Sequence, residues 1–373
     1  MKQVRPIDVH KEVKSFIDFP HDLYKSDPNY VPELYVAQRD LLTPGKHPFH
    51  DHSKVQLFLA SDGKVTTGRI AAILNNNHNA FSNSSDGFFG FFDCINDQET
   101  ADMLFGAAEK WLKENGANTI IGPENFSTNE TLGLLIEGFD SPPVVMMPYN
   151  APYYRQLLEK AGFKKKIDLL AYDVPYDTHN DRSVKLLDTL EERLRRRNIV
   201  IRKISMKSFW EDAKKARDVY NEAWGDNLGF VPMTEKEFHH MAKDLKMILN
   251  PDFCLIAEQE GKFVGFALGV PDINQIQIKI KRGRLLPFGI FKLLTGMKKI
   301  DRLRVMILGV VDGYRKSGIE ACLYGTIIKN ARKNNIKGAE CSWMLEDNYL
   351  MNNAIEQING VVYKKYRIFE KSI

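Results

Sequence analysis

The pattern of hydrophobic and polar positions predicts two similar series of strands and helices. After a strand at 4–7 and a helix at 9–24, apolar runs of strand length alternate with apolar residues at helical spacing. The first series runs strand, strand, strand, helix, strand, helix and strand, at residues 55–60, 65–74, 87–95, 97–115, 119–122, 152–161 and 167–174. A tight turn at Asp62-Gly63 joins the first two strands, which predicts a β-meander.

The second series repeats this order. It consists of a strand, two helices, a β-hairpin, a strand, a helix, a strand, a helix and a strand, at residues 199–204, 207–224, 234–249, 253–270, 305–311, 319–335, 339–345, 349–358 and 361–369. Such an order is typical of the α/β class, with mixed sheets and helices on both faces. We therefore predict domains at 1–174 and 199–373, joined by an amphipathic helical connector at 175–198.

The segment 308–326, LGVVDGYRKSGIEACLYGT, combines a strand end, a glycine-bearing loop and a helix start. Gly313 breaks the strand, and helical spacing begins at Ile319. Backbone N–H groups in such a loop, together with the positive end of the helix dipole, form an anion site. Arg315 and Lys316 add cationic side chains suited to a diphosphate. A cationic turn without a ligand is the alternative.

Arg315, Gly318 and their setting resemble the R-x-x-G-x-G/A loop of the GNAT (N-acetyltransferase) superfamily, in which loop amides hold the pyrophosphate of acyl-CoA. The segment 348–360 also resembles the N-x-x-A element of a later GNAT helix, and Asn150 with the following LEKAGF is similar in the first half. The chain departs from the loop pattern at Glu320, where the family has Gly or Ala. The resemblance covers nearly the whole chain and implies two tandem GNAT-like domains.

The resemblance also implies acetyl-CoA or a longer acyl-CoA as cosubstrate, and no metal. The residues of the second domain at the matching positions are Leu308, Val310, Val311, Arg315, Lys316, Ser317, Gly318, Ile319 and Asn348. The corresponding loop of the first domain, NDQET from Asn96, has no glycine and two acids. Because acids that face a diphosphate are unfavourable, we expect the first domain to be degenerate and without a CoA site.

Family members use a base to deprotonate the amine and often a tyrosine to protonate the departing thiolate. Ile355 stands at the usual tyrosine position, so Tyr349 or Tyr324 would have to replace it, and packing is the alternative role for both. Glu346 and Asp347 stand where a strand ends, the edge at which open α/β sheets carry their sites. These acids are therefore base candidates, and capping of the next helix explains them equally well.

Three further acids are weaker candidates for the base. Asp312 precedes Gly313 in a turn, and Glu222 and Asp226 lie at the end of a predicted helix. A turn residue and solvated helix-end residues need no catalytic function to explain them.

Composition narrows the class of protein. The chain of 373 residues is 43% hydrophobic and 27% charged, as in globular domains. No apolar run reaches the ~18 residues that span a bilayer, and residues 1–20 lack the apolar centre of a signal peptide. We therefore expect a cytoplasmic protein.

Neither the cysteines nor the clustered histidines predict a metal or a covalent mechanism. Single cysteines lie in apolar segments, at Cys94, Cys254, Cys322 and Cys341, and we expect buried, inert thiols. Histidines gather at His47, His50 and His52, without an accompanying acid or cysteine pattern. We expect this histidine cluster to belong to a turn.

The insert 273–302 is the most basic part of the chain. Residues 275–304 contain nine Lys or Arg and one acid, Asp301, so this stretch has a net charge of +8. The whole chain has a net charge of +4, so the remaining residues sum to −4. This local basicity favours an anionic partner over general binding of nucleic acid. The interleaved Leu, Ile and Phe residues suit an anionic membrane interface through 276–304. A packed flap, and contact with the 3′-phosphate of CoA, are the alternatives.

We therefore predict a cytoplasmic, CoA-dependent N-acyltransferase, peripheral at the inner face of the membrane if the insert binds lipid. The acceptor would be an amine-bearing small molecule or lipid. The competing hypothesis is a non-catalytic GNAT-like protein that binds acyl-CoA, a metabolite or a protein. Glu320 and Ile355 favour the second hypothesis, and Arg315 and Gly318 favour the first.

Overall fold

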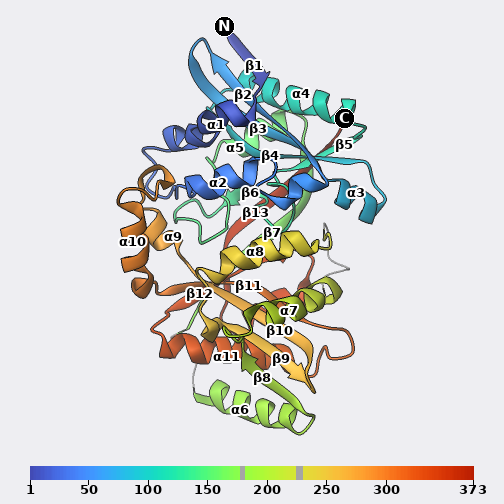
Figure 1. Cartoon of the computed structure of the whole chain (residues 1–373), viewed down its shortest axis with the longest axis vertical. Helices are drawn as coiled ribbons and strands as arrows, with labels where there is room; N and C mark the ends of the chain where they lie inside the picture. Colours follow the sequence, from blue (N-terminus) through green and yellow to red (C-terminus); the bar gives the residue numbers. More distant parts are fainter. Residues whose placement is uncertain (177–180, 224–229) are drawn as a thin grey trace. The chain divides into compact units, whose positions relative to one another are not determined.

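The computed structural model describes residues 1–176, 181–223 and 230–373, and the chain forms two compact units. Unit 1 contains Met1–Leu170, Asn274–Lys298 and Lys364–Ile373, whereas unit 2 contains Ala171–Ile273 and Lys299–Tyr363. Each unit is a mixed α/β structure, so the predicted fold class is confirmed (Figure 1).

Unit 1 is built on a sheet with strand order β1-β2-β3-β4-β5-β13, and β6 pairs with β13. Neighbouring strands are antiparallel except β4 and β5, which are parallel. The strands are β1 (Lys2–Pro6), β2 (Lys54–Asp62), β3 (Val65–Leu74), β4 (Asp86–Cys94), β5 (Thr119–Gly122), β6 (Leu134–Glu137) and β13 (Val361–Ser372). The helices are α1 (Val9–Leu23), α2 (Tyr35–Leu42), α3 (Asn76–Ser82), α4 (Gln98–Glu114), α5 (Tyr154–Lys160), α9 (Asn274–Gln277) and α10 (Gly289–Gly296).

The core of unit 1 lies where α4 and α5 cover the sheet. Apolar residues recur along α4 at helical spacing, and Leu104 and Phe105 are buried against sheet residues such as Ile70 and Phe89. Phe105 packs edge-on to Phe89, with ring centroids 5.5 Å apart. Burial of these large side chains supplies the main driving force for this unit.

Unit 2 repeats the arrangement with strand order β7-β12-β11-β10-β9-β8. The strands are β8 (Ile199–Lys203), β9 (Cys254–Gln259), β10 (Lys262–Pro271), β11 (Arg302–Val310), β12 (Gly338–Leu345) and the part of β7 (Lys164–Pro175) from Ala171 onward, the earlier part of β7 belonging to unit 1. The helices are α6 (Asp181–Arg195), α7 (Phe209–Ala223), α8 (Glu235–Lys246), α11 (Ile319–Lys333) and α12 (Tyr349–Glu356). Here too the antiparallel series β8 to β11 is followed by a parallel pair, β11 and β12. The predicted repeat of element order is therefore confirmed.

The units differ from the predicted domain boundaries in two segments. Most of the insert, Asn274–Lys298, and the chain end, Lys364–Ile373, belong to unit 1 although they follow residue 199 in the sequence. Arg282 and Arg284 bind Asp22 and Asp18 of α1, which holds the insert on unit 1. Distant ion pairs of this kind leave no trace in local periodicity.

Several elements are absent from the predicted series. Helices α2, α3 and α10 and the short strand β6 all lie in segments rich in Pro, Gly, Asn or Ser. The predicted connector corresponds to α6, which packs on α11: a Cβ added at Gly325 would lie 2.8 Å from Leu187. The connector is thus part of the packing of unit 2.

Among the described residues, no helix is long and apolar enough to cross a membrane. The same residues contain no group of three or more His, Cys, Asp or Glu arranged to hold a metal ion. The cysteines are buried free thiols, as predicted.

Candidate active site

Strands β11 and β12 of unit 2 part from each other halfway along their length. Their parallel register runs from Arg302 opposite Gly338 to Val305 opposite Cys341, whereas β11 continues to Val310 and β12 to Leu345. Just beyond the last pair, β11 carries a bulge, because consecutive residues of β10 face Val305 and Ile307 and Met306 is extra. Bulges redirect a strand and often lie beside active sites. Beyond Val305 and Cys341 the two strands are no longer paired with each other, and this unpaired stretch is called here the gap between β11 and β12.

The predicted anion loop follows β11 directly and leads into α11. Gly313, Lys316 and Gly318 have φ values of 83°, 60° and 95°. Left-handed residues of this kind turn successive N–H groups to one side, which produces an anion-binding concavity. Gly318 is the N-cap residue of α11, and among the described residues no side chain caps this helix end.

Two further features of the loop fit a diphosphate. The hydroxyl of Ser317 is buried and has no hydrogen-bond partner among the described residues. At Gly318, the only described atom within 4 Å of an added Cβ would belong to Leu190, at 3.5 Å, so there is open space on this side of the residue. The orphaned hydroxyl, the open space and the uncapped helix end together suit an anionic ligand, for which helix N-termini are ready sites.

Acids of the same loop compete for its donors. The Nε atom of Arg315 lies 3.1 Å from Oδ1 of Asp312, so the base candidate Asp312 is an ion-pair partner in this structure. Oε1 of Glu320 accepts the N–H of Lys316 at 3.4 Å. The Glu320 carboxylate therefore accepts a hydrogen bond from one of the backbone N–H groups that could otherwise bind a phosphate.

We predict that Glu320 weakens CoA binding. Glu320→Gln should lower the Kd for CoA by about threefold to tenfold, since it removes one partly exposed charge near the phosphates. Glu320→Gly should act in the same direction but with some loss of helix stability. Isothermal titration measures both. An unchanged or higher Kd for Glu320→Gln would mean that the carboxylate points away from the bound phosphates.

Tyr324 lies beside the gap between β11 and β12. Its hydroxyl is 3.7 Å from Sγ of Cys341, the last residue of β12 that pairs with β11. Burial raises the pKa of Tyr324 well above its usual value, with Cys341 and Tyr176 adding to the effect. The phenol therefore stays protonated near neutral pH. Burial likewise raises the pKa of Cys341 to about 12, which disfavours a nucleophilic thiolate.

The remaining sequence candidates lie at the start of α12. Asn348 is the N-cap residue and accepts the N–H of Met351 at 3.3 Å, so the cap is Asn348 and not an acid. Glu346 is half-buried, whereas Asp347 and Tyr349 are exposed. Buried Asn352, which the sequence analysis did not single out, donates to the carbonyl oxygen of Leu345 and holds α12 to the end of β12. Ile355 is buried and packs in the core.

A buried polar network ties β11 to β12 and was missed at the sequence level. Nε of Arg304 donates to Oγ of Ser342 at 3.1 Å, and this hydroxyl donates to Glu340 at 2.5 Å. Tyr363 also donates to Glu340. Arg304 and Glu340 stand opposite each other in the register, directly before the strands part. Charged residues inside otherwise apolar strand segments were the available signal.

The corresponding loop of unit 1 is closed by its own side chain. Asp97 is the N-cap residue of α4 and accepts the N–H of Thr100 at 2.8 Å. The ammonium of Lys2 lies 2.8 Å from the same carboxylate and holds the pKa of Asp97 at about 2. The carboxylate and its cation occupy the helix end, which agrees with the prediction that the first domain is degenerate.

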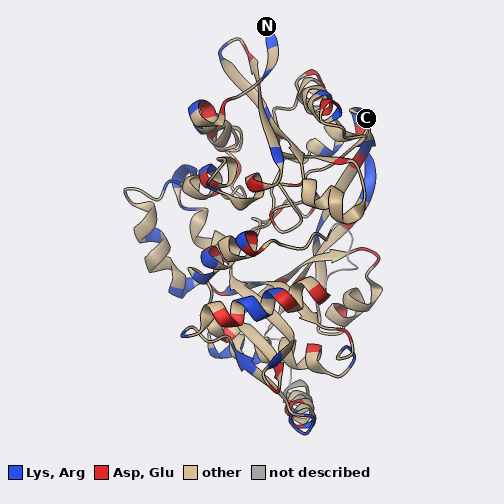
Figure 2. Cartoon of the chain, turned by 45° about the vertical axis from the view of Figure 1, so that its right-hand side comes forward, with Lys and Arg blue, Asp and Glu red and all other residues tan. Residues whose placement is uncertain are grey.

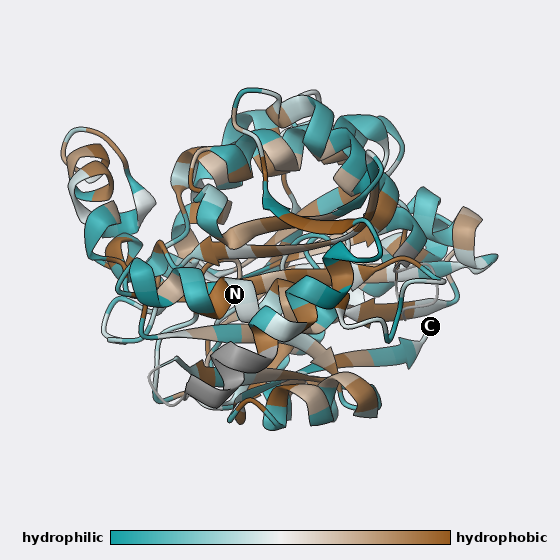
Figure 3. Cartoon of the chain, turned by 90° about the horizontal axis from the view of Figure 1, so that it is seen from below, coloured by the Kyte–Doolittle hydropathy of each residue, from teal (hydrophilic) through white to brown (hydrophobic). Residues whose placement is uncertain are grey.

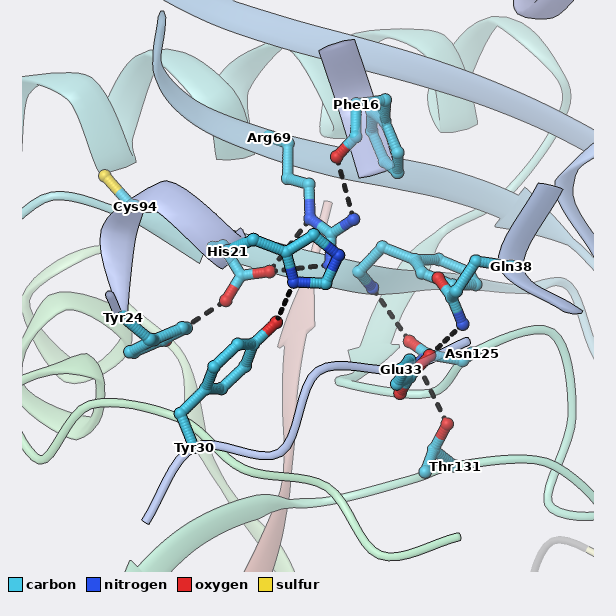
Figure 4. Close-up of polar contacts among 12 residues, drawn as sticks. Phe16, His21, Tyr24, Tyr30, Glu33, Gln38, Arg69, Cys94, Asn125 and Thr131 are labelled. Carbon is cyan, nitrogen blue, oxygen red and sulfur yellow. Dashed lines mark hydrogen bonds and ion pairs between the residues drawn. The ribbon is translucent and has the colours of Figure 1, made fainter. Parts of the chain in front are cut away.

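In unit 1, β4 continues beyond its pairs with β5, and another segment of the chain contacts this part of the strand. Phe91, with φ of 50°, donates its N–H to Oδ1 of Asn125 at 2.8 Å, and Asn125 in turn donates to Thr131 at 3.0 Å (Figure 4). A Cβ at Gly90 would collide with the carbonyl oxygen of Glu124. Residues 124 and 125 of the chain therefore cover this part of β4.

A second network of unit 1 is structural. Figure 4 shows Arg69, which pairs with Asp93 at 2.8 Å and donates to the carbonyl oxygen of Phe16. Tyr24 and Tyr154 also donate to Asp93. A buried ion pair needs such additional donors to offset its desolvation. All the charges of this network are satisfied internally, which favours a structural role.

Comparison with curated proteins identifies relatives over the full length of the chain. The chain is 38% identical over 370 residues to Protein YghO of Escherichia coli, covering 97% of this chain and 93% of that protein. It is 33% identical over 380 residues to "Bacterial ceramide synthase" of Caulobacter vibrioides, covering 99% of this chain and 97% of that protein. The chain belongs to the family of these two proteins. No family model matches it.

Solved structures show the fold of this family member. A tandem GNAT protein from the clavulanic acid biosynthesis pathway superposes with a TM-score of 0.59, covering 100% of this chain and 98% of that chain at 10% identity. A GCN5-related N-acetyltransferase from Sphaerobacter thermophilus gives 0.53, with 100% and 95% coverage at 13% identity. A probable N-acyltransferase from Enterococcus faecalis gives 0.52, with 100% and 73% coverage at 11% identity. The chain therefore has the tandem GNAT fold that the resemblance implied.

Proposed function

We propose that this protein is an acyl-CoA-dependent N-acyltransferase whose CoA site lies in unit 2 and whose acceptor is a long-chain, lipid-like amine. The observation that carries the proposal is the gap between β11 and β12, followed by a loop whose helix end is left uncapped by the described side chains. The name of the Caulobacter relative supports a lipid-like acceptor. Such an acceptor resides in a membrane, so the proposal includes peripheral binding to an anionic membrane surface.

Acyl-CoA would bind with its diphosphate over the loop. The N–H groups of Ser317, Gly318 and Ile319 at the start of α11 would hold the diphosphate, and Arg315 would exchange its contact with Asp312 for a phosphate oxygen. The thioester would then extend along Leu308, Val310 and Val311 of β11 and its following turn toward the gap. Backbone N–H groups beside the Met306 bulge would polarise the carbonyl.

Transfer requires one proton acceptor and one proton donor. The amine nitrogen attacks the thioester carbon, the C–N bond forms and the C–S bond breaks. Glu346, with Asp347 as the alternative, would accept the amine proton at the end of β12. Tyr324 would donate a proton to the CoA thiolate, since its hydroxyl lies beside the gap. Tyr349, exposed at the start of α12, is the alternative donor.

The proposal is tested by incubating purified protein with a long-chain acyl-CoA and a long-chain amine, with product detected by mass spectrometry. We expect an N-acyl amide and free CoA, and little product when the amine is a free amino acid. Arg315→Ala should raise the KM for acyl-CoA by about tenfold to a hundredfold, because a charge-assisted hydrogen bond contributes ~1.5–3 kcal/mol.

Lys329→Ala provides a control for Arg315→Ala, since Lys329 is a cation on α11, the helix that follows the loop, and is paired with Asp188. CoA binding without turnover for every amine would instead favour a non-catalytic binding protein. An unchanged KM in Arg315→Ala would remove this loop from the acyl-CoA site.

A further inference from the structure

The segment 279–298 of unit 1, called here the basic flap, is fixed at one end by two arginines. Arg282 binds both carboxylate oxygens of Asp22, at 2.6 and 3.1 Å, and Arg284 binds both of Asp18, at 2.8 and 3.0 Å. The guanidinium of Arg284 also lies 3.4 Å from the ring centroid of Tyr35. Bidentate pairs of this kind fix orientation as well as position. The flap is therefore a held structure and not a loose loop.

Glycines draw the inner side of the flap close to its support. At Gly283, a Cβ would collide with the carbonyl oxygen of Glu33, and at Gly296 it would lie 2.7 Å from Ile276 of α9. Ile276 and Ile280 are themselves buried. Because small residues take up the packed side, the larger apolar residues of α10 are left for the opposite side.

The outer side of the flap presents large apolar residues to solvent. Their exposed fractions are 79% for Leu286, 72% for Phe288, 64% for Phe291 and 66% for Leu294. Phe291 and Leu294 are three positions apart in α10, so they share one side of the helix. Figure 3 shows hydrophobic, brown residues along this segment. Clustered exposure of this size marks an interaction surface.

The charge of the flap is smaller than composition indicated. Of the nine cations at 275–304, Arg282 and Arg284 are paired with acids of α1, Arg302 is paired with Asp173, and Arg304 is buried in the β11–β12 network. Lys279, Lys281, Lys292 and Lys298 are exposed within the flap, which contains no acid (Figure 2). Four of the nine cations are therefore held by groups of the protein itself.

We propose that the basic flap is a membrane-docking element that inserts Leu286, Phe288, Phe291 and Leu294 between the headgroups of an anionic lipid surface. Apolar residues at the tip with lysines beside them are the pattern of interfacial segments. Charge complementarity selects the occupant: two copies of a flap with lysines and no acid repel each other, whereas anionic headgroups attract both. The inference deepens the proposed function. It rests on that function in one respect: docking serves the reaction only if the acceptor is a lipid held in the membrane.

The test is co-sedimentation of the full chain with vesicles of phosphatidylcholine alone and of phosphatidylcholine mixed with phosphatidylglycerol. We expect the protein to pellet with the anionic vesicles. Phe288→Glu with Phe291→Glu should reduce the partition coefficient at least tenfold, and Lys292→Glu with Lys298→Glu should do so by roughly fivefold or more per lysine. Phe81→Glu, at an exposed aromatic residue of α3, is the matched control and should bind like the wild type.

Three results would overturn the proposal. The wild type could fail to pellet with anionic vesicles, or the flap variants could bind as well as the wild type. Sedimentation velocity could also show a dimer that Phe291→Glu dissociates, which would make the occupant a second copy. Failure of the proposed function is distinguishable, because acyl transfer to a detergent-dispersed amine does not require docking. Thermal unfolding of each variant checks that the fold is retained.

Discussion

Glu124→Gln is expected to stabilise the protein by about 3 to 5 kcal/mol at pH 8 and by less than about 1 kcal/mol at pH 5. Glu124 is 5% exposed, so its carboxyl group lies in the interior, away from solvent. Burial raises its pKa from 4.5 to about 8. Between these two values the folded protein binds one more proton than the unfolded chain, so stability falls as pH rises. Glutamine cannot ionise and avoids this loss.

Urea unfolding at pH 5, 6.5 and 8 measures the effect. Glu114→Gln is the control, because Glu114 is an exposed acid on α4 of the same unit and its substitution should change stability little at any of these pH values. A difference between Glu124→Gln and the wild type that is the same at pH 5 and pH 8 would show that Glu124 has an ordinary pKa.

Gly318→Asp is expected to weaken CoA binding at least a hundredfold, about 3 kcal/mol. Two effects act together in the loop. The backbone at Gly318 has φ of 95°, which strains any residue with a Cβ. The added carboxylate also stands at the uncapped N-terminus of α11, where it can accept the N–H groups that a phosphate would use. Asp97 already plays this role at the start of α4 in unit 1.

Two control variants separate these effects. Gly318→Ala introduces the backbone strain without the charge, and should weaken binding much less than Gly318→Asp. Gly45→Asp places the same residue at another glycine with φ of 78° and open surroundings, and should leave CoA binding unchanged. Isothermal titration with CoA measures all three. Equal affinity in Gly318→Asp and the wild type, with folding intact, would place the diphosphate elsewhere.

Only those residues of the candidate site that are adjacent in the sequence could be predicted from the sequence. Strand β11, the loop and α11 form one uninterrupted segment, so Gly313, Arg315 and Gly318 could be assigned from local spacing and chemistry. Tyr324 was a candidate from its place on α11, but its position beside Cys341 depends on the packing of that helix on the sheet. The link between Arg304 and Ser342 joins residues on different strands. No local pattern specifies which strand will be the neighbour.

The difference between the two units has the same physical basis. Acids in the loop at 96–100 indicated a degenerate first domain, and the cap formed by Asp97 is the local contact behind that prediction. The hydrogen bond from Phe91 of β4 to Asn125 joins residues 34 positions apart, and it supports the same conclusion. Sequence chemistry indicated the loss of the site, whereas the tertiary structure showed which side chain replaces the ligand.

By itself, the sequence determined the order of elements, the repeat and the loop, because these depend on apolar spacing and turn residues within a few positions. Only the tertiary structure decided which unit holds the basic flap and which side of it faces solvent. Arg282 and Asp22 are 260 positions apart, and their ion pair attaches the flap to unit 1. Composition showed that the segment was basic and apolar, but it could not show that its arginines turn inward and its phenylalanines outward. That choice depends on acids of α1 and on glycine contacts, which meet the segment only once the chain has folded.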